Sequence, residues 1–117
     1  MSSLKGRDEY NYELAAASHG EATLIGDHQT ANQSYSNIVK CLLNLRKHED
    51  EGDASLLRLA HNKNPSIACW ASTHLLATNE SKAIDRLEQL ATDEAGIIGF
   101  GAEMVLQEWR ADRLKLP

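Results

Sequence analysis

Five histidines and two cysteines are the residues in this chain that could hold a transition metal. The short zinc motifs need ligands a few residues apart, as in His-Glu-x-x-His or Cys-x-x-Cys. Neither motif occurs, and the histidines are never three or four residues apart; they are His19, His28, His48, His61 and His74. We therefore predict no bound metal and no other cofactor, and we expect most of the histidines to lie at the surface.

Cys41 and Cys69 are the candidate nucleophiles, and each stands beside apolar residues. A reactive thiolate needs a cationic neighbour or the N-terminus of a helix. Cys69 falls four or five residues into a predicted helix, which is too deep for strong help from the helix dipole. The sequence therefore predicts buried, reduced and unreactive thiols.

Gly96, Gly99 and Gly101 form a Gly-x-x-Gly-x-Gly sequence. A dinucleotide-binding loop of similar composition follows a β-strand, whereas a helix is predicted before Gly96. Carboxylates such as Glu103 have the spacing of a solvated helix face rather than of an acid–base pair. We therefore predict that the protein is not an enzyme.

Two acidic clusters and two ring-bearing residues remain as candidates for binding a partner. They are Glu49, Asp50, Glu51, Asp53, Asp93 and Glu94, together with Trp70 and His74. If the connections between helices share an edge, both clusters face one basic partner, and Trp70, or His74 one turn later, is the apolar centre within a polar rim. The alternative is that the carboxylates are solvated and simply favoured at helix N-termini.

The elements that must position these residues are all predicted to be helices. Apolar periodicity indicates helices near 8–25 and 28–48, two more within 53–77, one from about 81 and one from about 95 to 110. Caps are expected at Asp27, at Asn64 before Pro65, at Asn79 or Ser81, and at Asp93. The run from Glu49 to Asp53 reads as a loop, and residues 1–7 as a flexible segment. The first helix is expected to bury Tyr10, Leu14 and Ala17, and the second Ala31, Tyr35, Ile38, Leu42 and Leu45.

A repeat of 31 residues relates the segments 53–77 and 81–110. The matched pairs are all apolar: Leu56 with Leu87, Leu59 with Leu90, Ala60 with Ala91, Ile67 with Ile98, Ala68 with Gly99, Ala71 with Ala102, and Leu75 with Leu106. Two antiparallel helices per unit are typical of an α-solenoid. We therefore predict an all-α, short HEAT-like solenoid of about three antiparallel hairpins, forming a single domain over 1–117.

The repeat also predicts which residues form the core, and it leaves two interpretations of Trp70. The residues expected to be buried are Leu59, Ile67, Ala71, Leu75, Leu87, Leu90, Ile98, Ala102 and Leu106. Trp70 lies off this stripe, and its repeat partner is Gly101. Trp70 either fills the space over that glycine or is a partly exposed anchor, while Trp109 is expected in the core.

The segments NPSIACWASTHLL and AGIIGFGAEMVLQEW, the second ending at Arg110, carry a family resemblance. Together with Gly26-Asp27, Asn32 and Tyr35, they resemble a family of small bacterial HEAT-like proteins, domain of unknown function number twenty-nineteen, over residues 8–117. An Arg commonly follows the Pro turn in that family, whereas Ser66-Ile67-Ala68 stands here. The family has no established activity, so the resemblance implies a fold and no site residues.

Composition narrows the classes of function. The 117 residues carry twelve Lys and Arg against seventeen Asp and Glu, a net charge of −5, which disfavours nucleic acid as a partner. No apolar run approaches the length of a membrane span, the first ten residues lack the apolar run of a signal peptide, and a cytoplasmic location is expected. We expect a bacterial protein-binding module with a basic protein partner, and an immunity protein that neutralises a basic toxin such as a nuclease fits this profile. The alternatives are an enzyme or nucleic-acid-associated HEAT-like protein, and a self-assembling structural domain or homodimer.

Overall fold

Six α-helices and no strand make up residues 4–117, the part of the chain that the computed structural model describes. The helices are α1 (Leu4–Ile25), α2 (His28–Arg46), α3 (Asp50–Ala60), α4 (Pro65–Leu75), α5 (Glu80–Asp93) and α6 (Gly96–Arg110). The predicted all-α fold of three helical hairpins is confirmed. Because α1 begins at Leu4, residues 4–7 are helical, and only residues 1–3 of the segment expected to be flexible lie outside the described part.

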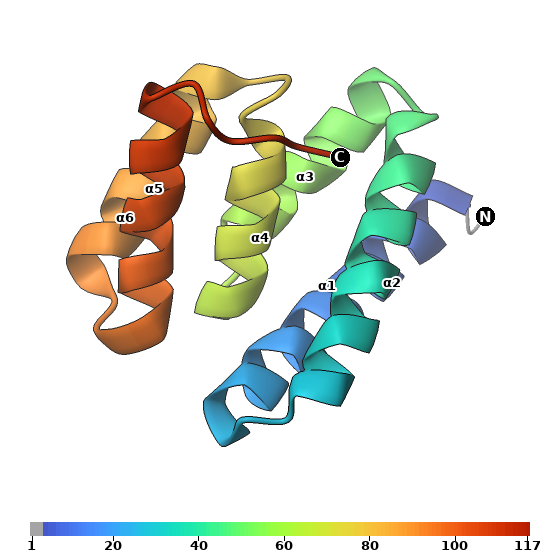
Figure 1. Ribbon diagram of the computed structural model, residues 1–117. Coiled ribbons are helices and arrows are strands. Elements are labelled where there is room, and N and C mark those ends of the chain that lie inside the picture. The colour runs from blue at the N-terminus through green and yellow to red at the C-terminus, as the bar shows by residue number, and fades with distance from the viewer. Residues whose placement is uncertain (1–3) are drawn as a thin grey trace.

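The three hairpins stand side by side, with α2, α4 and α6 nearer the viewer than α1, α3 and α5 in Figure 1. The connections within the hairpins lie at the lower end of that view, and the α2–α3 and α4–α5 connections lie at the upper end. Helix α4 packs against α1, α3, α5 and α6, and the C-terminal segment 111–117 crosses over it (Figure 1). The helix that carries Trp70 and His74 is therefore the central element of the molecule.

Two of the predicted helix starts have the expected side-chain caps. The backbone N–H of Thr30 donates to Asp27 Oδ1 at 3.1 Å, and the backbone N–H of Ser66 donates to Asn64 Oδ1 at 2.9 Å. Pro65 occupies the first turn of α4, where its missing N–H leaves no hydrogen bond unmade. Asn79 precedes α5 without a side-chain cap bond.

Two of the expected boundaries are wrong. The acidic run is not a loop, because α3 begins at Asp50 and takes the following acidic residues into its first turn. Carboxylates are stabilised there by the partial positive charge of the helix N-terminus. Asp93 does not cap the last helix; it is the final residue of α5, and Ala95 is the N-cap of α6.

The core follows the 31-residue register through the second and third hairpins. Of the fourteen matched residues, only Ala91 and Ile98 are partly exposed, and the others are buried. The register predicts Ile98 in the core, whereas Ile98 borders an open cavity. Trp109 is half-buried rather than fully buried, and its indole N–H donates to Glu80 Oε2 at 2.6 Å. The HEAT-like character of the repeat stays a prediction.

The first hairpin buries a different face of α1 from the one expected. Tyr10 and Leu14 are 59% and 52% exposed, whereas Tyr12, Ala15 and Ala16 are buried. The alanines let α1 approach its neighbours closely, and Tyr12 finds a hydrogen-bond partner inside. The expected stripe of α2 is buried except for Tyr35, which is 43% exposed.

Candidate functional site

An open cavity of about 220 Å³ lies among α1, α4 and α6, toward the end of the molecule that carries the connections within the hairpins. Each helix contributes residues spaced three or four apart, so one face of each helix borders the space. The lining residues are His19, Gly20, Thr23 and Leu24 from α1, Ser66, Cys69, Trp70 and Thr73 from α4, and Ile97, Ile98, Gly101 and Val105 from α6. None of them is an acidic residue, a lysine or an arginine.

The hydroxyl groups in this lining are engaged with the backbone rather than with the cavity. Thr23 Oγ1 donates to the His19 carbonyl at 2.8 Å, and Thr73 Oγ1 donates to the Cys69 carbonyl at 2.7 Å. Ser66 Oγ reaches across to α1 and donates to the Ala16 carbonyl at 3.0 Å. Because these donors are satisfied, the cavity presents a largely apolar surface.

Burial favours the neutral form of both titratable residues in the lining. Burial lowers the pKa of His19, and burial raises the pKa of the Cys69 thiol to about 11. Desolvation disfavours the charged form in both cases. Both shifts favour the uncharged form of the side chain, which is the direction that the sequence predicts for the Cys69 thiol.

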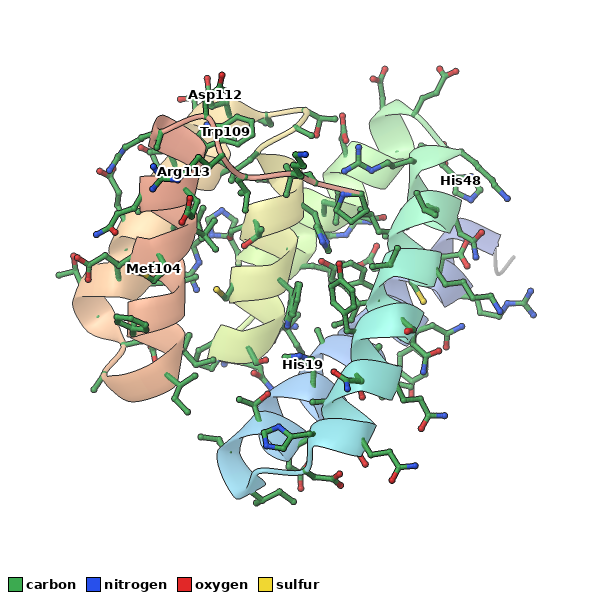
Figure 2. The ribbon with its side chains drawn as sticks, in the orientation of Figure 1. His19, His48, Met104, Trp109, Asp112 and Arg113 are labelled. Atoms are coloured by element: carbon green, nitrogen blue, oxygen red, sulfur yellow. The ribbon has the colours of Figure 1, made fainter. Side chains whose placement is uncertain are left out.

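Trp70 forms one wall of the cavity and joins the first hairpin to α4. Its ring lies 5.0 Å from His19 of α1 in an edge-to-face arrangement, and 5.5 Å from Tyr35 of α2. Figure 2 shows His19 where the first hairpin faces α4. The repeat partner of Trp70, Gly101, borders the same cavity and has open space where a Cβ would stand. Trp70 therefore does not fill the space over Gly101. Both residues line the same open cavity.

His74 is not an exposed anchor, and its assignment to a binding surface is wrong. It is 1% exposed, and its Nδ1 lies 2.7 Å from the buried hydroxyl of Tyr12. Burial, together with the nearby Arg46 guanidinium, lowers the pKa of His74 to about 4. Arg46 is itself partly enclosed, and its Nε and Nη2 have no hydrogen-bond partner among the described residues. These residues form a polar element of the core.

The two acidic clusters do not share an edge. Glu49, Asp50 and Glu51 are exposed at the upper end of Figure 1, where α2 passes into α3. Asp93 ends α5 and Glu94 follows it in the α5–α6 connection at the lower end, just before the first cavity-lining residues of α6. The expectation that both clusters flank Trp70 is therefore wrong. Only the second cluster lies at the cavity end, and a role for Glu49, Asp50, Glu51 and Asp53 in binding stays a prediction.

Large apolar side chains are exposed around the cavity. Leu24 and Ile97, which line it, are 73% and 55% exposed, and Ile25 and Phe100, which follow Leu24 and precede Gly101 in the sequence, are 74% and 65% exposed. Apolar periodicity on these helices predicts a core face, so the sequence pattern does not identify this exposed surface. The sequence does contain one indication of it. The cavity-lining positions of α1, α4 and α6 carry no Asp, Glu, Lys or Arg, and those of α1 and α6 include a glycine, Gly20 and Gly101.

Comparisons with family models, with curated proteins and with solved structures found no match to this chain. Within residues 4–117, no group of three or more His, Cys, Asp or Glu side chains is arranged to hold a metal ion. In the same part of the chain, no helix has the length and hydropathy needed to cross a membrane.

Proposed function

We propose that this protein is a non-catalytic protein-binding module whose binding surface is the apolar cavity and the exposed side chains around it. One observation carries the proposal: an uncharged cavity opens among Leu24, Ile97 and their exposed apolar neighbours. Contiguous exposed apolar surface marks interaction sites in soluble proteins, and aromatic residues in desolvated pockets supply much of the binding energy at interfaces. Trp70 occupies such a position.

The more specific form of the proposal is that the partner is basic. The net charge of −5 supports it, because an acidic protein attracts and orients a cationic partner. Neutralisation of a basic toxin such as a nuclease, by a cytoplasmic immunity protein, is the version that best suits a small acidic chain with no identified catalytic group.

Site-specific photo-crosslinking in cells tests the module function. A benzophenone amino acid placed at Ile97, at the cavity, is compared with the same group at Leu43, which is 49% exposed on α2 and does not line the cavity. We expect one defined protein to be crosslinked from position 97 and not from position 43. The crosslink should disappear when Gly101→Leu fills the cavity.

Two other outcomes would contradict the proposal. Equal and unsaturable labelling from both positions would show that the cavity is not a preferred binding surface. A crosslink between two copies of this chain would favour the self-assembling domain instead.

A further inference from the structure

We infer that the cavity accepts one aromatic or branched aliphatic side chain from a partner segment that carries Lys or Arg on both sides of that side chain. This inference rests on the proposed function and specifies the chemistry of the partner. Two features of the cavity end carry it: the size and neutrality of the cavity, and the unpaired carboxylates around it.

The volume suits a single large apolar side chain. A dry cavity of about 150 Å³ in a protein core takes a benzene molecule, and this one measures about 220 Å³. Gly101 keeps this side of the cavity open, since no atom from another helix lies within 4 Å of the position a Cβ would take. His19, neutral through burial, and the engaged hydroxyls offer no group that would pair with a charged side chain. A desolvated apolar side chain is the occupant that this lining stabilises.

The charged side chains next to the cavity-lining residues of α1 and α6 are acidic, and none of them forms an ion pair with another described side chain. Glu94 lies three residues before Ile97, Asp93 precedes it, and Glu21 lies one turn before Leu24. The ion pairs among the described side chains use other carboxylates: Asp8 with His48, Glu9 with Arg58, Glu88 with Arg110, and Glu108 with Arg113. The α3–α4 connection at the same end of the molecule contributes one lysine, Lys63, and no arginine. A basic segment supplies the charges that this end lacks.

Peptide titrations followed by NMR test the inference directly. The probes are a capped peptide of sequence Lys-Lys-Ala-Phe-Ala-Lys-Lys, a second in which Ala replaces Phe, and a third in which Glu replaces every Lys. We expect the first peptide to shift the Gly101 amide and Trp70 indole resonances. The second should bind roughly tenfold or more weakly, because burying a Phe side chain contributes a factor of that order. The third should bind more weakly still, and added salt should weaken only the first two.

Matched variants separate local from overall charge. The pair Asp93→Lys with Glu94→Lys should weaken binding of the first peptide severalfold. The pair Glu49→Lys with Glu51→Lys makes the same change in net charge at the opposite end and should leave binding nearly unchanged. Gly101→Leu should abolish the Phe-dependent part of binding. Leu24→Ser, at a side chain 73% exposed, gives a second test at the cavity mouth if the glycine variant folds poorly.

Four results would overturn the inference: equal binding of the Phe and Ala peptides, equal binding of the Lys and Glu peptides, equal loss from the two charge-reversed pairs, or no binding of any peptide. Its failure is distinguishable from failure of the proposed function. A crosslinked partner without peptide binding would mean that the module function holds and the partner chemistry is wrong. Peptide binding without a crosslinked partner would mean that the cavity has the inferred chemistry and that the proposed module function is wrong.

Discussion

At the scale of single residues, burial changes the protonation of polar side chains and gives them a role in stability. His74 is the clearest case, because its ring is neutral inside the core and bonded to Tyr12. The ordinary pKa of 6.5 falls to about 4 in the folded protein through desolvation and the neighbouring Arg46. Between these values the unfolded chain binds a proton that the folded protein does not.

This difference predicts that stability falls as the pH falls from 6.5 toward 4. The contribution of His74 is fully present above pH 6.5, and the shift corresponds to about 3 kcal/mol in total. Urea denaturation at a series of pH values measures it. His74→Gln should lower stability at pH 7 and flatten the pH dependence between these limits. An equally steep dependence in that variant would mean that other groups cause the loss.

Replacement by Ala is expected to have opposite effects on stability at two glycines of α6. A Cβ at Gly99 would overlap the carbonyl of Glu94, whereas a Cβ at Gly101 would meet nothing. Gly99→Ala should therefore lower the melting temperature, because backbone must move. Gly101→Ala should raise stability by about 1 kcal/mol through helix propensity. Thermal and urea unfolding of the two variants compares them, and the same sign for both would contradict the packing of α6 on the α5–α6 connection.

At the scale of elements, caps decide where helices begin. Asn64 accepts a hydrogen bond from the Ser66 N–H at the start of α4, while Asn79 makes no side-chain bond at the start of α5. Asn64→Ala should therefore cost about 1 kcal/mol of unfolding free energy. Asn79→Ala is the matched control and should cost much less. Chemical denaturation measures both, and equal losses would show that the Asn64 cap contributes nothing specific.

At the scale of the whole molecule, the repeat places Leu75 and Leu106 at equivalent sites in the second and third hairpins. Both are buried, with 0% and 4% exposure. Leu75→Ala and Leu106→Ala should each lower the unfolding free energy by about 2–5 kcal/mol. The larger loss is expected at Leu75, because α4 packs against helices of all three hairpins. An unchanged melting temperature in either variant would contradict the shared register.

Several local features of this protein were determined by its sequence alone. Helix type and the caps at Asp27 and Asn64 depend on residues within one or two turns of each other, and the structure confirms them. Periodicity states that one face of a helix is apolar. It does not state which partner covers that face, or whether any does.

The candidate site was decided by the tertiary structure, since its parts come from distant segments. Tyr12 and His74 are 62 residues apart in the chain, and their contact selects the buried face of α1 and removes His74 from the surface. The cavity exists because three helix faces meet around Trp70 without filling the space over Gly101. Hairpin connectivity separates the acidic clusters, because successive connections fall at alternate ends of the helices (Figure 1). Such arrangements depend on how whole helices pack against one another, and short-range sequence patterns do not predict that packing.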